Sequence, residues 1–567
     1  MGRVIVAGVV TSLSLASFAF PSRGAGEKPL VLDNIAITLG ATTYRIPHME
    51  IEGASLPFAE MATLFPSGDS NLAARLARVS ARRIVVPAMS SESRDRSRVA
   101  RADYRKLVFE NVTSGRAEIV RADGGEETIE STKGGVRRIQ WGVSAAKGVD
   151  LAGIARLGTT RNEADAPLTP LVDEEVVDST RLEDAGANVV LTTGRVTIAG
   201  VRGRALRTPA DLLIERLERF DAAKPQDDSA LMGELLDALQ SFEAASIDVE
   251  NIATTGMGES SAKPFTSMIA RFGLSKAAGT GAGEIFVDDF SLAASDGGNL
   301  SVQRFALNDL QLSPVMQGGA YPRLARFELR GLAADLPDAK NGEASRIKFS
   351  VENARANFEN FLETTPTKFS GRVDNFMVDL TARGETQTTG RFLTLGYRDL
   401  TLSGFAAGEW REKTSEAALE PVMIDAKDMG AAAVSAQFGN VSSAAFSSSP
   451  AISRAALLTT SIKSLDLTLD GGGLVDRMLA LEAKERKTSI EQARVDYAKA
   501  ASTAIAALLG AGANASTLAE AVAAYIEKPK RLHLHLVAPK GINALDALLR
   551  KPSEILESLE VEASADK

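Results

Sequence analysis

The stretch Phe305-Ala-Leu-Asn-Asp-Leu-Gln-Leu312 decides the fold, because its apolar residues recur at nearly every second position. The same pattern returns in Phe327-Glu-Leu-Arg-Gly-Leu332, Tyr397-Arg-Asp-Leu-Thr-Leu402 and Ile462-Lys-Ser-Leu-Asp-Leu-Thr-Leu469. Successive side chains of a β-strand point to opposite faces, so each stretch predicts a strand with one apolar face. Turn residues such as Asp296-Gly297-Gly298-Asn299 separate these stretches. Together they predict a large antiparallel meander.

Length and composition restrict the class of protein. A chain of 567 residues with 44% hydrophobic residues predicts two or three domains with ample core material. A net charge of -9 argues against nucleic acid as a partner. The absence of cysteine excludes disulfides, a thiol nucleophile, an iron–sulfur cluster and a cysteine-type zinc site.

The first residues follow the order that is typical of an export signal. Arg3 is followed by the apolar run Val4–Phe20, and Ser17-Phe18-Ala19 fits a small-x-small cleavage site. We therefore expect a signal peptide over residues 1–19 and a periplasmic or secreted protein. The alternative is an uncleaved inner-membrane anchor, although Ser12, Ser14 and Ser17 dilute the apolar run.

The expected fold class is α+β, with large, mostly antiparallel β-meander sheets, a helical hairpin insertion and a helix-rich C-terminal unit. The acidic stretch Gly158–Gly186, which contains Pro167 and Pro170, predicts a long loop or linker. The expected divisions are a β-rich unit at 30–157, a linker with strands at 158–208, a helical hairpin at 209–245, a β-meander at 246–469 and a helix–strand–helix unit at 470–567.

Capping patterns locate several of the expected helices. Thr208-Pro209-Ala-Asp211 combines an N-cap hydroxyl with proline at the first helical position. A second helix of the hairpin is expected over Ala230–Ala245, and a short helix over Phe265–Phe272. Thr488-Ser-Ile-Glu491 and Thr517-Leu-Ala-Glu520 fit the capping-box pattern and predict two C-terminal helix starts.

Histidine is too rare to support most catalytic arrangements. It occurs only at His48, His533 and His535. His533 and His535 lie two residues apart on one expected strand face, where two imidazoles could bind a metal. A polar outer face opposite Leu534 is the better interpretation, because no acid or third histidine is near in sequence. No Gly-x-Ser-x-Gly motif is present to form a serine triad.

Three other short motifs also carry little weight. Ser260-Ser-Ala-Lys263 matches Ser-x-x-Lys, but the companion Ser-Asp-Asn and Lys-Thr-Gly motifs are missing. Gly279-Thr-Gly-Ala-Gly283 lacks the spacing of a nucleotide-binding loop and predicts a flexible turn. The acid pairs Asp227-Asp228 and Asp288-Asp289 are typical of solvated loops. We therefore expect no catalytic residue, no metal and no cofactor; a serine hydrolase is a remote alternative.

One dense basic region stands out from the acidic chain. Guanidinium groups bind phosphates through two parallel hydrogen bonds, so the region predicts an anionic partner, and a phospholipid or another anionic envelope lipid is the expected one. The alternative is a solvated rim neutralised by Glu92, Asp95 and Asp103. The candidate residues are Arg75, Arg78, Arg82, Arg83, Arg94, Arg96, Arg98, Arg101 and Arg105, followed by Lys106.

The C-terminal third resembles a known kind of envelope protein. Leu465-Asp-Leu-Thr-Leu-Asp-Gly-Gly-Gly-Leu-Val-Asp-Arg477 and Ala521–Val537 resemble segments of AsmA-like and YdgA-like periplasmic proteins of proteobacteria, which have no assigned activity. The resemblance to the AsmA-like group implies a β-groove that shields lipid chains. This chain is short for that group and has no secure membrane anchor, which argues against a bridge across the whole periplasm.

Two functions follow as expectations. The first is a non-enzymatic envelope protein that binds or shields lipid on an amphipathic sheet. The second is a structural or protein-interaction module, with envelope proteins as partners, whose apolar face its own helices seal. Burying one large apolar side chain contributes roughly 1.5–3 kcal/mol, so we expect a mostly sealed core and at most a limited groove at its edge. The substitution Leu307→Asp should then sharply lower the melting temperature.

Overall fold

The computed structural model describes residues 28–566, apart from 40–41, 66–70, 95–97, 132–134, 160–165, 209–212, 214–215, 217–228, 258–262, 314–321, 339–344 and 383–386. The chain forms two compact units, unit 1 (Met1–Ser295) and unit 2 (Asp296–Lys567). This boundary falls inside the stretch 246–469, which the sequence assigns to a single meander. The expected signal peptide lies outside the described residues. Among the helices that the structure describes, none is both long and apolar enough to cross a membrane.

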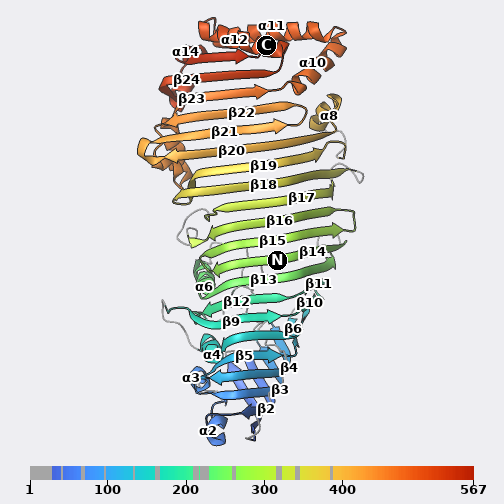
Figure 1. Ribbon diagram of the computed structural model, residues 1–567, viewed down its shortest axis with the longest axis vertical. Helices are drawn as coiled ribbons and strands as arrows, with labels where there is room; N and C mark the ends of the chain where they lie inside the picture. The colour runs from blue at the N-terminus through green and yellow to red at the C-terminus, as the bar shows by residue number, and fades with distance from the viewer. Residues whose placement is uncertain are drawn as a thin grey trace. The chain divides into compact units, whose positions relative to one another are not determined.

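Unit 1 is built from antiparallel strands with four described helices beside them (Figure 1). Its strands are β1 (Leu30–Leu39), β2 (Thr42–Glu52), β3 (Ala81–Arg94), β4 (Arg98–Thr113), β5 (Arg116–Ala122), β6 (Gly125–Ser131), β7 (Val136–Trp141), β8 (Ser144–Asp150), β9 (Thr169–Val177), β10 (Thr180–Asp184), β11 (Val189–Thr193), β12 (Val196–Gly203), β13 (Phe242–Met257), β14 (Pro264–Ala278) and β15 (Gly281–Ala294). Its helices are α2 (Phe58–Ala62), α3 (Leu72–Leu76), α4 (Leu151–Thr159) and α6 (Ser229–Gln240).

The short strands in the middle of unit 1 are halves of long, interrupted strands. The long strand β4 pairs with β5 through one half and with β6 through the other. From there two rows of pairing run side by side, β5–β8–β9–β12 and β6–β7–β10–β11. Both rows end on β13, which pairs with β12 and with β11. The topology is therefore a meander whose strands break once near their middle.

The N-terminal part of unit 1 has a sealed hydrophobic core. Side chains of β1–β5, β8 and β9 pack with those of α2, α3 and α4, and Met61 of α2 and Ala117 of β5 are fully buried. Burial of such side chains removes apolar area from water and stabilises the fold by roughly 25 cal/mol per Å². The helices that seal this core are thus α2, α3 and α4.

Unit 2 is a meander in which each strand pairs with the next along the chain, from β16 to β25 (Figure 1). Its strands are β16 (Asn299–Gln311), β17 (Arg326–Pro337), β18 (Arg346–Leu362), β19 (Thr365–Asp379), β20 (Asp399–Arg411), β21 (Glu416–Ala426), β22 (Gly430–Gly439), β23 (Ser461–Asp470), β24 (Arg531–Asn543) and β25 (Glu560–Ala565). Its helical elements are α8 (Gln387–Thr394), η2 (Glu412–Thr414), η3 (Ser443–Phe446), α9 (Pro450–Thr459), α10 (Gly473–Arg486), α11 (Ile490–Leu509), α12 (Ala513–Glu527), α13 (Ala544–Leu549) and α14 (Pro552–Glu557).

The expected antiparallel β-meander and helix-rich C-terminal region are confirmed. Helices α10, α11 and α12 follow β23, and β24 returns beside it. Tyr525 of α12 packs with Leu532 of β24, and the Tyr525 hydroxyl donates a hydrogen bond of 2.6 Å to the Gly471 carbonyl. Leu518 of α12 packs with Leu556 of α14 in a second small core. These contacts hold the helices against the last two strands.

A left-handed residue interrupts many of the long strands near their middle. Asn251 in β13, Asp289 in β15, Gly331 in β17 and Asn375 in β19 all have φ between +49° and +60°. Side chains normally alternate between faces, so a slip of one residue moves an apolar set to the other face. In β17 the apolar set is Phe327 and Leu329 before the kink, and it changes phase after Gly331. At the kink, the apolar side chains of β17 therefore change from odd-numbered to even-numbered positions.

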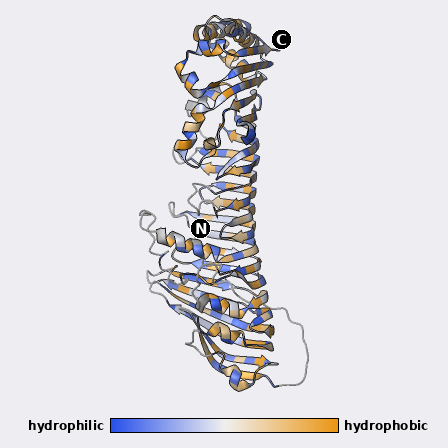
Figure 2. Cartoon of the chain, turned by 90° about the vertical axis from the view of Figure 1, so that its left-hand side faces the viewer, coloured by the Kyte–Doolittle hydropathy of each residue, from blue (hydrophilic) through white to orange (hydrophobic). Residues whose placement is uncertain are grey.

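The phase change is visible in which residues are exposed. Along β14, Met268 and Ala270 are exposed, and Arg271 is exposed too, at the level where Asn251 and Asp289 interrupt the neighbouring strands β13 and β15. Two consecutive exposed residues in a strand show that the outward-facing set has shifted by one. Figure 2 shows the alternation of hydrophilic and hydrophobic residues along the strands.

Two expectations for unit 1 are wrong. The stretch 158–186, expected as a loop or linker, contains β9 and β10, which pair with neighbours on both sides. The stretch 265–272, expected as a helix, is part of β14, because its apolar residues Phe265 and Ile269 also fit a period of two. A four-residue spacing satisfies both periods, and the partners β13 and β15 decide for a strand.

The expected helix boundaries also change. Helix α6 ends at Gln240, five residues early, because Phe242 begins β13; the first helix of the expected hairpin falls mostly outside the described residues. The N-cap of α11 is Ser489, whose Oγ accepts a hydrogen bond from the backbone N–H of Gln492 at 3.1 Å. Helix α12 begins at Ala513, so Thr517 is already inside it and donates to the Ala513 carbonyl.

Candidate functional site

The candidate site is the apolar face of strands β16 to β22 in unit 2. Phe305 of β16 and Phe327 of β17 meet edge to face on it, with ring centroids 5.8 Å apart. Leu329 of β17 and Val373 of β19 continue the face, because Leu329, Ala354 and Val373 are paired in register across β17, β18 and β19. We call this surface the apolar face.

Side chains on the apolar face remain accessible to solvent. Phe369 is 36% exposed, Val373 38% and Ile424 54%. Leu307 and Phe376 are only half-buried. Large apolar side chains are usually buried when a core is available, so this row of exposed ones makes the face a candidate binding surface. Among the described residues, Leu307 is therefore only partly shielded from solvent.

Most of the described helices of unit 2 pack away from the apolar face of β16–β19. Helix α12 packs on β24 and β25, and α13 packs on β24 and α9. The 3-10 helix η3 contacts β19, and its Phe446 stacks on Trp410 of β20 at 4.8 Å. Tyr397, one of the residues expected on the apolar face, is buried below the Arg477 guanidinium of α10 at 4.0 Å. In the described part of unit 2, helices thus seal the C-terminal end of the sheet and leave the face of β16–β19 largely open.

The dense basic region of the sequence is spread over α3, β3 and β4, and carboxylates neutralise much of it. Arg82 and Arg83 both pair with Glu52, at 3.2 and 3.4 Å. Arg94 and Arg101 both approach Glu92, at 2.8 and 3.8 Å. Such exposed pairs contribute little stability, about 0–1 kcal/mol each, but they lower the local positive potential.

The remaining candidates of that region do not gather at one place. Arg78 pairs with Glu60 of α2 at 3.3 Å, and Arg75 lies in α3. Arg98 and Arg105 lie in β4, and Arg96 falls outside the described residues. The interpretation as a rim of ion pairs, left open by the sequence, describes these side chains better than a single anion site does.

His533 and His535 both lie close to the carboxylate of Asp466. His535 Nδ1 lies 2.5 Å from Asp466 Oδ1, and His533 Nε2 lies 3.9 Å from the same oxygen. The sequence offered no acid for this pair, because Asp466 is distant in the chain and becomes a neighbour only through the register of β23 with β24. Among the described residues, no group of three or more potential ligands could hold a metal ion.

Of the other short motifs, the glycine-rich stretch and the acid pair at Asp289 lie among the described residues. Gly279 lies in the turn between β14 and β15, as expected, and Gly281 begins β15. Asp289 is the left-handed residue of β15, which makes it part of the strand kink rather than of a solvated loop. Ser260 and the pair Asp227-Asp228 lie outside the described residues.

Sequence reasoning missed the buried carboxyl group of Glu127. Glu127 of β6 is 8% exposed and lies between Ala102 of β4 and Ile139 of β7 in the strand register. Burial raises the pKa of Glu127, and the charge of Arg98 partly opposes this rise. The charge of Glu127 in turn adds to the effect of burial in raising the pKa of Tyr44. No local motif marks Glu127, because its burial depends on neighbours from other strands.

Comparisons with known proteins inform only the C-terminal region. A family model described as "Uncharacterized protein" matches residues 423–566. This range runs from β21 to β25 and contains both segments that resemble AsmA-like and YdgA-like proteins. No curated protein and no solved structure matches the chain.

Proposed function

We propose that this protein is an exported, non-enzymatic envelope protein that binds the acyl chains of lipids on its apolar face. The observation that carries the proposal is the exposure of Phe369 and Val373 on β19 and of Ile424 on β21, which Gly404 of β20 joins in register with Val373. Each large apolar side chain left in water forgoes roughly 1.5–3 kcal/mol, which an acyl chain lying across the strands would recover. The resemblance to AsmA-like proteins supports the same function.

The first test uses a matched pair of substitutions in β19. Val373 and Met377 are equally exposed, at 38%. Val373 follows Arg372 of the polar face and lies on the apolar face; Met377 alternates with Phe376 and Val378 and lies on the polar face. Purified wild-type protein should yield phospholipid in solvent extracts analysed by mass spectrometry. Val373→Asp should lose most of this lipid, because an acyl chain cannot solvate a carboxylate.

The control is Met377→Asp, a substitution on the opposite face of the same strand. Met377→Asp should retain lipid like the wild type, and both variants should melt close to the wild-type temperature because both sites are partly exposed. Wild-type protein that carries no lipid and does not bind a fluorescent phospholipid analogue would contradict the proposal. Equal lipid loss in both variants would also contradict it, since the loss would then not be specific to one face.

A protein-interaction module remains the second candidate, and a different surface favours it. Ile452, Leu457 and Leu458 of α9 are about half exposed, and Leu549 of α13, the helix that packs on α9, is 77% exposed. Clustered exposed apolar residues on helices are typical of sites that bind another protein. Leu457→Glu should then abolish a pull-down of envelope proteins and leave the lipid content unchanged, whereas loss of lipid would assign this patch to the lipid site.

A further inference from the structure

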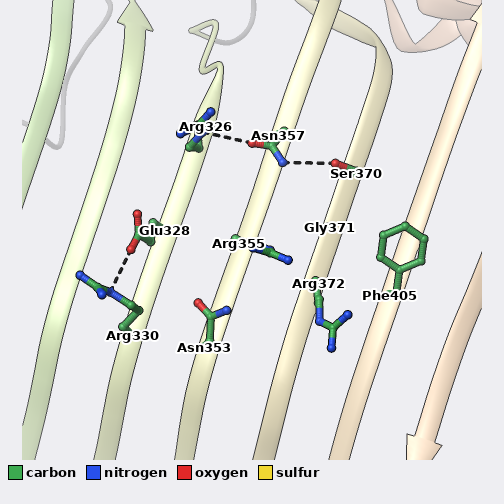
Figure 3. A pocket seen from close by; sticks show the side chains of 10 residues that line it. All are labelled: Arg326, Glu328, Arg330, Asn353, Arg355, Asn357, Ser370, Gly371, Arg372 and Phe405. Carbon is green, nitrogen blue, oxygen red and sulfur yellow. Dashed lines mark hydrogen bonds and ion pairs between the residues drawn. The ribbon is translucent and has the colours of Figure 1, made fainter.

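A cavity lies on the polar face of unit 2, on the opposite side of the strands from the apolar face. Its volume is about 570 Å³, and strands β17 to β20 supply its walls. Figure 3 shows its lining residues, which are Arg326, Glu328, Arg330, Asn353, Arg355, Asn357, Ser370, Gly371, Arg372 and Phe405.

The cavity concentrates positive charge in an acidic chain. Four arginines and one glutamate line it, which leaves an excess of three positive charges (4 - 1 = 3), whereas the whole chain carries -9. Glu328 Oε1 pairs with Arg330 Nε at 2.9 Å. Arg372 Nε pairs with Asp374 at 2.6 Å, outside the lining. In contrast to the arginines of β3, Arg355 forms no ion pair with any residue that the structure describes.

The strand register places two of these cations side by side. Arg355 of β18 is the direct cross-strand partner of Arg372 of β19. Figure 3 shows the Arg355 side chain extending from β18 toward β19. Arg355 also lies opposite Glu328 of β17, but the ion pair of Glu328 is with Arg330. Like charges at directly opposite positions destabilise a sheet, so the pair of Arg355 and Arg372 costs free energy that a bound anion would offset. Hydrogen bonding to Arg372 and the charge of Arg355 help to hold the pKa of Asp374 below its usual range, as a positive local potential requires.

We infer that this cavity binds a phosphate group. Two guanidinium groups on neighbouring strands can each donate parallel hydrogen bonds to phosphate oxygens. Asn353 and Asn357 supply amide donors beside them, and Phe405 offers an aromatic surface for the organic part of a phosphorylated ligand. The inference is independent of the proposed acyl-chain site, because alternate residues of the same strands form the two surfaces.

The test measures binding of inorganic pyrophosphate to the full chain by titration calorimetry at low salt. The wild type should bind it, and Arg355→Gln should weaken binding roughly tenfold or more, because a charge-assisted hydrogen bond contributes about 1.5–3 kcal/mol. Arg355→Lys should fall between the two, since lysine keeps the charge but lacks the planar fork. The control is Arg486→Gln on α10, which removes an exposed arginine that pairs with Glu482 and should leave binding unchanged.

Thermal melting separates ligand binding from a structural role. Without ligand, Arg355→Gln should melt at or above the wild-type temperature because it removes cross-strand repulsion. With pyrophosphate, only the wild type and Arg486→Gln should gain stability. A lower melting temperature of ligand-free Arg355→Gln, with unchanged pyrophosphate binding, would show that Arg355 is structural and overturn the inference.

Parallel assays identify the source of the phosphate. Sedimentation with phosphatidylglycerol vesicles, but not with phosphatidylcholine vesicles, that is lost in Arg355→Gln would support a lipid head group. Binding of pyrophosphate without binding of vesicles would support a soluble phosphorylated ligand. No Arg355-dependent binding in either assay would overturn the inference, and so would equally tight, Arg355-dependent binding of a polyglutamate peptide, which carries carboxylates instead of phosphate.

Discussion

Single ionisable residues respond to their strand partners. His48 of β2 lies opposite Asp33 of β1, and its Nδ1 is 2.7 Å from Asp33 Oδ1, while its Nε2 is 3.3 Å from Glu50 Oε1. The hydrogen bonds to Asp33 and then to Glu50 raise the pKa of His48 above 6.5. Proton NMR can resolve this titration because the chain contains three histidines.

We expect the His48 ring to titrate above 6.5 in the folded protein, and Asp33→Asn to shift its pKa downward. Because the folded-state pKa is raised, the stabilisation by protonated His48 is complete below the unfolded-state pKa and is lost as pH rises through the folded-state pKa. His48→Gln should therefore lack this pH dependence in urea unfolding. An unchanged His48 titration in Asp33→Asn would contradict the assignment.

Glu127 gives the same sign of pH dependence for a different reason. Burial raises its pKa, so the unfolded chain loses this proton at a lower pH than the folded chain does. Stability should fall as pH rises from the unfolded-state pKa to the folded-state pKa and stay lower above it. Glu127→Gln should thus be more stable than the wild type near pH 7 and equally stable at a pH where Glu127 is protonated in both states. Urea unfolding at both pH values measures this; a destabilised Glu127→Gln at pH 7 would show that the carboxylate is needed.

At the scale of elements, left-handed residues set the course of many of the long strands. Asn375 of β19 has φ +49°, and its backbone N–H donates to Ser403 Oγ of β20 at 3.1 Å. Its side chain also hydrogen-bonds to Glu352 of β18. Asparagine and glycine tolerate this conformation, whereas a β-branched residue does not. The kink is therefore encoded locally and fixed by two neighbouring strands.

Replacement of Asn375 tests this role. Asn375→Val should lower the free energy of unfolding by roughly 1–2 kcal/mol, the cost of a left-handed conformation for an ordinary side chain. Asn375→Gly, the matched control, should cost less because glycine adopts this φ without strain. Equal loss of stability in the two variants, measured by urea unfolding, would assign the effect to the lost hydrogen bond with Glu352 and not to the backbone.

At the scale of the whole molecule, the prediction concerns export. The order of Arg3, the apolar run Val4–Phe20 and Ser17-Phe18-Ala19 motivates it. Expressed in a proteobacterial host with its full sequence, the protein should appear in the periplasmic fraction, and intact-mass spectrometry should find an N-terminus at Phe20. Ala19→Asp should block processing because the cleavage site requires a small residue. Full-length protein starting at Met1 in the membrane fraction would favour the anchor instead.

The sequence by itself determined the β-meander and the helix-rich C-terminal region, because period-two alternation and helix capping are local signals. A recognisable local signal was also present at the kinks, where Gly331 or Asn375 stands at a change in apolar phase. A strict alternation with a period of two does not predict such a change of phase. The strands β9 and β10 were missed because acidic and proline residues masked their period.

Only the tertiary structure decided which surfaces carry a site. The arginines of β3 meet carboxylates: Arg82 and Arg83 pair with Glu52, and Arg94 pairs with Glu92. Nothing in the sequence singles out Arg355 or Arg372. They become direct neighbours through the register of β18 with β19. Register depends on the pairing of whole strands and not on local composition. For the same reason, the open apolar face follows from where the helices pack, which no single stretch of the sequence encodes.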